Sequence, residues 1–336
     1  MGALPLARAW RGRRLARVPV VTLMPHSRCN CRCVMCDIWK ANRNGTSLEQ
    51  AAMDRLVEDF SALGVRWVVL SGGEALMHPN LWGLCAALKT LPLKITLLSS
   101  GLLLERHAAD IVDWCDEVIV SLDGPEATHN RIRGIKDAYA SLAAGVGALR
   151  RRRADYPVAA RCVIQRGNFH ELPAIVDAAK AIGLDSISFL GADLTSTAFN
   201  RPQAWAEGRV EEVGLAPVEC DALDAVIDQL AASHGGDFAG RYIQESPARL
   251  RRISAQYRAA RGLAPPPSVR CNAPWVSTVV EADGTVRPCF FHEPIGSLRD
   301  GTLPEILNGP VARSFRAALD VGSDPICQRC VCSLKL

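Results

Sequence analysis

The stretch Val18-Pro19-Val20-Val21-Thr22-Leu23-Met24 leads, four residues later, into Cys29-Asn30-Cys31-Arg32-Cys33-Val34-Met35-Cys36. The first segment is an apolar run typical of a buried strand. The second holds Cys29, Cys33 and Cys36 in the spacing C-x3-C-x2-C. Three thiolates in one short loop can hold three corners of a cubane iron–sulfur cluster, because soft thiolates suit such clusters. The fourth iron would then keep an open position, as a catalytic zinc does.

A fourth cysteine in the same loop leaves another interpretation open. With Cys31 included, four thiolates could close the coordination of a structural zinc, or of a cluster that only transfers electrons. The loop alone therefore predicts a metal site, and the rest of the chain has to distinguish an open site from a closed one.

Strand and helix patterns alternate over the first 190 residues. Apolar runs predict six strands, at 18–24, 66–70, 94–98, 117–121, 158–164 and 186–190. Helical patterns separate them, and Ser47 with Gln50 is predicted to cap the helix that Gly64 ends. This alternation predicts an α/β fold with a parallel sheet covered on its outer face, which fits a partial (β/α)6 barrel of the TIM type. A doubly wound open sheet is the alternative.

Local composition suggests where the parts of the chain begin and end. We divide it into a basic N-terminal arm at 1–17, a barrel at 18–190, connecting helices with a substrate loop at 191–268, and a small C-terminal domain at 269–336. The boundary before the last part is marked by Pro265-Pro266-Pro267. Within it, Asp283-Gly284 is a strong signal for a β-hairpin.

Composition narrows the class of protein. The 336 residues are 49% hydrophobic and 22% charged, as in ordinary globular proteins, and the net charge is only +4. This charge gives no argument for nucleic-acid binding, and no apolar run is long enough to cross a bilayer. We therefore predict neither a nucleic-acid partner nor a membrane partner. The 13 cysteines are clustered, which indicates metal binding in a reducing compartment and a cytoplasmic location.

Two motifs together resemble a known family. C-x3-C-x2-C after the first strand, with Gly72-Gly73-Glu74 after the second, resembles the radical S-adenosylmethionine (SAM) superfamily over residues 18–190. The resemblance implies a [4Fe–4S] cluster whose open iron binds the amino and carboxylate groups of SAM. One electron from the cluster would split SAM into methionine and a 5′-deoxyadenosyl radical that abstracts a hydrogen atom, while the protein positions the cofactor. Cys31 is then not a ligand.

The resemblance also assigns individual residues. Cys29, Cys33 and Cys36 would hold the catalytic cluster. The positions that match SAM-binding segments of the superfamily are Met35, Ser71, Gly72, Gly73, Glu74, Ser99, Ser121, Asp123, Arg133 and Asn168. Among them, Glu74 offers a carboxylate to the amine of SAM, and Arg133 offers a planar guanidinium to its carboxylate.

A second group of cysteines resembles the SPASM and twitch extensions of radical SAM enzymes, which hold auxiliary clusters. The resemblance implies one auxiliary [4Fe–4S] cluster in the domain 269–336, with a structural zinc as the alternative. Its four expected ligands are Cys271, Cys289, Cys327 and Cys330. Cys332 is left over, as an alternative ligand, a thiol that donates hydrogen, or an inert residue.

These motifs together predict an enzyme of the radical SAM oxidoreductase type. Twitch-type relatives include carbinol dehydrogenases, so we expect oxidation of an unactivated C–H bond in a small molecule, with the auxiliary cluster taking an electron. A reductase or a flavodoxin-type protein would supply the initial electron. The alternative is a peptide-modifying maturase that crosslinks or epimerises; the short segment before the first strand makes it the second choice. A non-catalytic iron–sulfur or zinc protein is the third.

Overall fold

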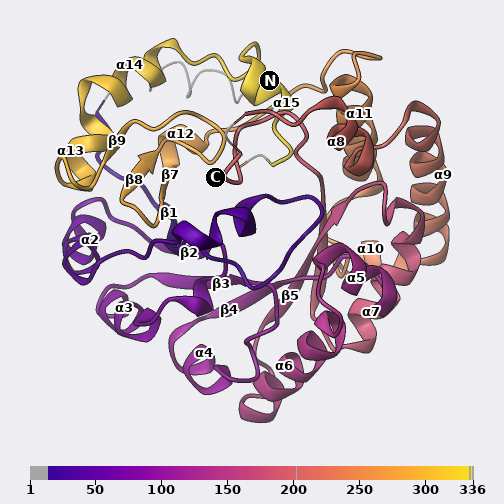
Figure 1. Ribbon diagram of the computed structural model, residues 1–336, viewed down its shortest axis with the longest axis horizontal. Helices are drawn as coiled ribbons and strands as arrows, with labels where there is room; N and C mark the ends of the chain where they lie inside the picture. The colour runs from indigo at the N-terminus through magenta and orange to yellow at the C-terminus, as the bar shows by residue number, and fades with distance from the viewer. Residues whose placement is uncertain (1–13, 202, 333, 335–336) are drawn as a thin grey trace.

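A computed structural model describes residues 14–201, 203–332 and 334. Most of the basic arm predicted at 1–17 therefore lies outside the described residues. Six parallel strands form the centre of the molecule, with helices around their outside (Figure 1). The strands are β1 (Val20–His26), β2 (Trp67–Gly72), β3 (Lys94–Ser99), β4 (Glu117–Ser121), β5 (Val158–Ile164) and β6 (Ser186–Gly191). All six predicted strands are confirmed.

The outer layer consists of the helices that connect these strands. They are α2 (Gln50–Ala62), α3 (Leu81–Leu88), α4 (Ala108–Trp114), α5 (Glu126–Arg133), α6 (Ala138–Arg152) and α7 (Leu172–Ala181), with short 3-10 turns η1 (Ile38–Asn44), η2 (Ala75–Met77) and η3 (Phe169–Glu171). The sheet order is β6-β5-β4-β3-β2-β1-β7-β8-β9, so β6 is an edge strand and does not pair with β1. The fold is therefore an open, partial barrel, as predicted.

The start of α2 differs from the prediction. The capping box of Ser47 and Gln50 does not form, because the helix begins at Gln50 itself. The Ser47 hydroxyl is instead 2.7 Å from Nδ1 of His26, and the backbones of the two residues form a β-bridge. A contact between distant parts of the chain thus replaces a local cap.

The C-terminal part of the chain extends the barrel sheet. The predicted hairpin forms as β7 (Ser277–Val280) and β8 (Thr285–Arg287), and β7 pairs in parallel with β1. The remaining elements are β9 (Gly296–Ser297), α8 (Glu207–Val213), α9 (Pro217–Ser233), α10 (Gly235–Ala239), α11 (Pro247–Ala260), α12 (Ala273–Val276), α13 (Leu303–Asn308), α14 (Pro310–Ala318) and α15 (Pro325–Arg329). Because Val280 of β7 pairs with Leu23 of β1, the turn of the hairpin lies at the end of β1 that leads into the first cysteine group.

Side chains on the central strands alternate between two environments. On β5, Val158, Ala160, Cys162 and Ile164 are buried beneath the outer helices, whereas Arg161 is exposed on the inner face. This period-2 pattern leaves the inner face free for a site. No helix within the described residues is long and apolar enough to cross a membrane.

Candidate active site

The cysteine loop after β1 is held by its backbone. The amide of Arg32 donates to the carbonyl of Arg133 (2.9 Å), and the amide of Val34 donates to that of Ile132 (3.0 Å), both at the end of α5. Gly134 ends α5 with φ +65°, and a Cβ there would lie 2.8 Å from the Arg32 carbonyl oxygen. Glycine therefore permits the close approach of α5 to the loop.

The thiols in this loop lie close together, and the pKa values of two of them are lowered. Cys33 is buried, and the Cys31 thiol donates a hydrogen bond to it that, with the Arg133 charge, lowers the pKa of Cys33 to about 6. Hydrogen bonding with Cys31 also lowers the pKa of Cys29, and because Cys31 carries one thiol proton, its thiol serves only one of these two neighbours at a time. Burial raises the pKa of Cys36 to about 12. Thiolates are the ligating form of cysteine, so this donor set fits an iron–sulfur cluster.

The Gly72-Gly73-Glu74 turn lies directly against the cysteine loop. A Cβ on Gly73 would lie 2.0 Å from the Arg28 carbonyl oxygen, and one on Gly72 would lie 2.6 Å from that of His26. The amide of Glu74 donates to the Arg28 carbonyl at 2.8 Å. Both glycines are therefore needed for the turn to approach the loop.

The Glu74 side chain ties this turn to the end of β3. It is 1% exposed, and its Oε2 accepts bonds from the Ser100 amide (2.8 Å), the Ser100 hydroxyl (2.7 Å) and the Ser99 hydroxyl (3.2 Å). Burial raises the pKa of Glu74, while these bonds act in the opposite direction. The Ser100 hydroxyl also reaches Oδ1 of Asn30 at 3.0 Å, so the predicted SAM turn is coupled to the cluster loop.

Asp123 and Arg133, two of the predicted SAM-binding residues, form an ion pair with each other. Nη2 of Arg133 is 2.5 Å from Oδ2 of Asp123, and their side chains are 9% and 0% exposed. Nη1 of Arg133 also donates to Sγ of Cys33 at 3.5 Å. His129 accepts the Asp123 amide at Nδ1 (3.2 Å); burial, then the Arg133 charge, lower its pKa to about 3, so the ring is neutral. The Arg133 charge is therefore partly neutralised within the chain.

Asn168 has a comparable internal role. It is fully buried, and its Nδ2 donates to the Asp123 carbonyl at 2.8 Å, while Oδ1 accepts the Gln165 amide at 2.8 Å. It thereby joins the ends of β4 and β5. Its contact with SAM stays a prediction.

One cation on the inner face was not anticipated from the sequence. Arg161 is the strand partner of Ser121 on β4 and of Ser188 on β6, so the three form a polar row. Nε of Arg161 donates to the Ser188 hydroxyl at 3.4 Å, and no carboxylate of the described residues lies within 4.0 Å of the guanidinium. An arginine in the middle of an otherwise apolar strand was the available signal.

A pocket of about 380 Å³ opens beside these elements. Its wall combines residues next to the cysteine loop, the glycine turn, a segment after β6 and the β7–β8 hairpin. The lining residues are Met24, His26, Ser27, Ile38, Ala41, Asn44, Thr46, Gly72, Gly73, Thr197, Ala198, Phe199, Asn200, Arg201, Glu281, Ala282, Asp283, Arg287 and Phe290. Burial lowers the pKa of His26, so a neutral imidazole faces this space.

The second cysteine group is also brought together. Sγ of Cys330 lies 3.9 Å from Sγ of Cys332. Burial raises the pKa of Cys289 to about 11, and the nearby charges of Cys332 and Cys271 act in the same direction. These residues come from separate elements, before α12, after β8 and after α15. This sulfur-rich donor set fits the predicted auxiliary cluster.

A histidine joins the second group. Nε2 of His292 lies 3.4 Å from Sγ of Cys327, and Oδ1 of Asp324 is close to both. Asp324 caps α15 by accepting the amide of Cys327 at 2.9 Å. His292 follows Cys289 by three residues, but no pattern in the sequence connects it with Cys327.

Models of two protein families match the barrel and the C-terminal part of this chain. Residues 23–192 match the radical SAM superfamily, and residues 271–331 match the SPASM iron–sulfur cluster-binding domain. The chain belongs to the radical SAM superfamily. The predicted family, its [4Fe–4S] cluster with SAM and its iron–sulfur C-terminal domain are thereby confirmed.

Curated relatives share the radical SAM part. The chain is 30% identical over 166 residues to Fe-coproporphyrin III synthase of Methanosarcina barkeri, covering 47% of this chain and 40% of that protein. It is 32% identical over 163 residues to PqqA peptide cyclase of Methylorubrum populi, covering 46% and 41%. The matched region thus spans less than half of either relative.

Solved structures share the fold over most of the chain. SuiB of Streptococcus suis bound to its precursor peptide SuiA aligns with a TM-score of 0.63 at 12% identity, over 95% of this chain and 72% of that one. The enzyme anSMEcpe with bound AdoMet and a Cp18Cys peptide aligns with a TM-score of 0.65 at 16% identity, over 93% and 88%. At these identities the likeness establishes the radical SAM fold alone.

Proposed function

We propose that this protein cleaves SAM reductively and uses the resulting radical to oxidise an unactivated C–H bond of a small molecule. A cluster held by Cys29, Cys33 and Cys36 would, when bound, supply the electron that splits SAM into methionine and the 5′-deoxyadenosyl radical. That radical takes a hydrogen atom from the substrate and becomes 5′-deoxyadenosine. The substrate radical would then lose one proton and one electron, and an auxiliary cluster held by Cys271, Cys289, Cys327 and Cys330 would supply an acceptor for that electron.

The chain's own residues would perform the positioning. Cys29, Cys33 and Cys36 would hold the first cluster, and the turn containing Glu74 would place the methionine part of SAM beside it. The exposed guanidinium of Arg161 offers the barrel interior a cation able to pair with a carboxylate. Catalysis of this kind depends on holding the reacting carbon close to the radical, because misplacement by about 1 Å can cost about 100-fold in rate.

The observation that carries this proposal is the position of the pocket. It reaches His26 and Ser27 on one side of the cysteine loop and Ile38 on the other, and it also reaches Phe290, which follows Cys289. A substrate in this pocket would lie next to both cysteine groups. Its volume, about 380 Å³, falls within the range of about 300–1,000 Å³ for small-molecule sites.

A peptide substrate is the second candidate. One curated relative is named for the cyclisation of the PqqA peptide, and the SuiB and anSMEcpe structures contain peptides. The pocket is open to solvent and could accept one side chain of a peptide. This observation favours a maturase without indicating which residue it would modify.

The experiment uses metabolites and peptides extracted from cells grown in heavy water. The reconstituted enzyme is incubated anaerobically with SAM, reductant and either the small-molecule or the peptide fraction, and 5′-deoxyadenosine is analysed by mass spectrometry. Deuterium transfer from the small-molecule fraction supports the first candidate, and transfer from the peptide fraction supports the second. Absence of 5′-deoxyadenosine in every sample would contradict both.

A further inference from the structure

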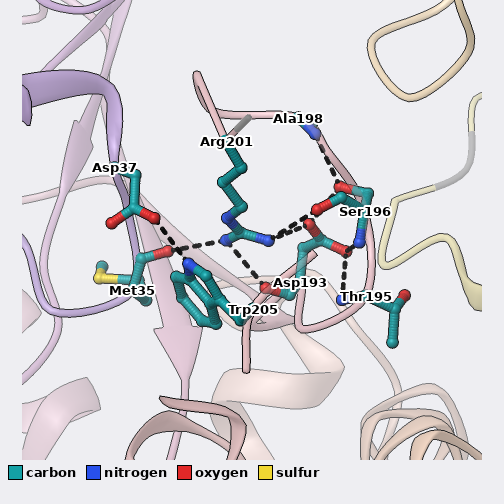
Figure 2. Close-up of polar contacts among 8 residues, drawn as sticks. All are labelled: Met35, Asp37, Asp193, Thr195, Ser196, Ala198, Arg201 and Trp205. Atoms are coloured by element: carbon teal, nitrogen blue, oxygen red, sulfur yellow. Dashed lines mark hydrogen bonds and ion pairs between the residues drawn. The ribbon is translucent and has the colours of Figure 1, made fainter. Parts of the chain in front are cut away.

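A segment after β6 lies against the cysteine loop. This segment, residues 193–209 apart from 202 and called the strap below, is organised around Arg201 (Figure 2). Nη1 of Arg201 lies 2.7 Å from Oδ2 of Asp193, and Nη2 donates to the Asp193 carbonyl at 3.0 Å. The two side chains are 0% and 3% exposed. Nη2 also donates to the carbonyl of Met35 at 3.4 Å, 166 residues away in the sequence.

A second strap residue, Trp205, holds the same loop. The guanidinium of Arg201 lies over the ring of Trp205, 3.7 Å from its centroid, and Nε1 of Trp205 donates to Oδ2 of Asp37 at 2.6 Å. Figure 2 shows this chain of contacts from Asp37 through Trp205 and Arg201 to Asp193. The contacts at Met35 and Asp37 flank Cys36, the third cysteine of the C-x3-C-x2-C motif.

The strap also forms one wall of the pocket. Thr197 to Arg201 line it, and within this wall Phe199 and Asn200 have φ of +63° and +60°. Left-handed backbone at non-glycine residues persists only where the surrounding structure enforces it. Here the ring of Phe199 packs on Phe290 at 4.8 Å, and Arg201 fixes the other end. The pocket wall and the flanks of Cys36 therefore belong to one connected unit.

We propose that Arg201 is a positioning residue for the first cluster. By holding the Met35 carbonyl directly, and Asp37 through Trp205, it fixes the backbone that carries Cys36 and thus the place of the open iron relative to the Glu74 turn. Its charge is balanced by Asp193, so it acts through position more than through net charge. This inference rests on the radical SAM chemistry proposed above.

A purely structural ion pair would behave differently. Buried pairs often add little net stability, and removing both partners together can restore it. If Arg201 only neutralised Asp193, the double variant D193N/R201M would recover every property of the wild type. If Arg201 positions the loop, the double variant recovers stability but not the properties of the cluster, because the bond to Met35 is still missing.

The test compares reconstituted wild type with R201M, R201K and D193N/R201M. Iron and sulfide content, the thermal midpoint, the change that SAM causes in the EPR spectrum of the reduced enzyme, and 5′-deoxyadenosine formation are measured. The matched control is R258M, which removes an arginine paired with Asp224 at 2.8 Å between α11 and α9. We expect R201M to bind iron, to show an altered or absent SAM-induced EPR change, and to form 5′-deoxyadenosine about 10- to 100-fold more slowly.

The other variants separate the possible outcomes. R201K should be intermediate, because lysine keeps the charge but loses the planar fork that reaches two acceptors. R258M should keep the wild-type EPR change and lose less in thermal midpoint than R201M, because the Arg258–Asp224 pair is 26% and 30% exposed. Should R201M fail to fold, W205F, which loses the bond to Asp37 but keeps an aromatic ring beside the Arg201 guanidinium, is expected to alter the same EPR change to a smaller degree.

Two results would overturn the inference while leaving the proposed function intact. One is a wild-type SAM-induced EPR change in R201M, or in W205F if R201M does not fold. The other is full recovery of the EPR change and rate in D193N/R201M. If the wild type itself shows no SAM-induced change and no 5′-deoxyadenosine, the proposed function fails first.

Discussion

Arg133 provides the most detailed prediction, because the sequence and the structure suggest different roles for it. The resemblance assigns its guanidinium to the carboxylate of SAM, whereas the structure pairs it with Asp123 at 2.5 Å in a buried position. In R133M, Asp123 would keep the Val163 amide at 2.9 Å as a donor but would lose its only ion-pair partner among the described residues.

The expected cost follows from this geometry. Removing one partner of a buried ion pair costs about 3–5 kcal/mol, because the other charge stays buried without compensation. In D123N/R133M no such charge remains, so we expect the loss to shrink to about 1–2 kcal/mol, the scale of a few hydrogen bonds. The two single changes should therefore be strongly non-additive.

The assay measures urea unfolding midpoints of reconstituted protein by tryptophan fluorescence, together with SAM binding by equilibrium dialysis. If Arg133 both stabilises the fold and binds SAM, the double variant regains stability but not SAM affinity. If it is only structural, the double variant regains both. Additive losses, within about 0.5 kcal/mol, would refute the coupling that we derive from the ion pair.

Three further predictions concern pH, metal content and substrate. The pKa of His129 is about 3 in the folded protein and about 6.5 in the unfolded chain, so the free energy of unfolding falls as pH falls through this window, by at most about 1.4 kcal/mol per pH unit. H129Q should therefore lose less stability than the wild type between about pH 7 and pH 5. Urea midpoints that fall equally in the two proteins would contradict this. C330A should lower the iron content from about eight to about four per chain, whereas C332A should keep about eight; equal losses would make Cys332 a ligand. R161M should keep the SAM-induced EPR change but lose deuterium transfer from a carboxylate substrate, and unchanged transfer would exclude Arg161 from substrate binding.

The strands and the main cysteine motifs could be predicted because their signals are local. An apolar run and a C-x3-C-x2-C spacing can each be recognised within a few residues. The alternation of strands and helices then predicts a parallel sheet, in which the loops that follow the strands lie at one edge. The same local reasoning failed at Ser47, where a cap was expected and the hydroxyl bonds to His26 instead. Contacts across the fold override local propensity there.

The remaining site residues depend on contacts between distant segments. Nothing near Arg201 in the sequence indicates that it reaches Met35, and nothing near His292 indicates that it lies beside Cys327. Arg161 is intermediate, since its position in an apolar strand was visible but its neighbours on β4 and β6 were not. Residues that support a site are harder to predict than those in its motif, because only the folded chain brings them together.

The most direct test of the account is the formation of 5′-deoxyadenosine. Anaerobically reconstituted wild type is mixed with SAM and dithionite, and the product is quantified beside C36A, which lacks one proposed ligand of the first cluster. We expect 5′-deoxyadenosine and methionine in equal amounts from the wild type and essentially none from C36A. Wild type that holds its iron and sulfide but leaves SAM intact, or C36A that cleaves SAM at the wild-type rate, would contradict the account.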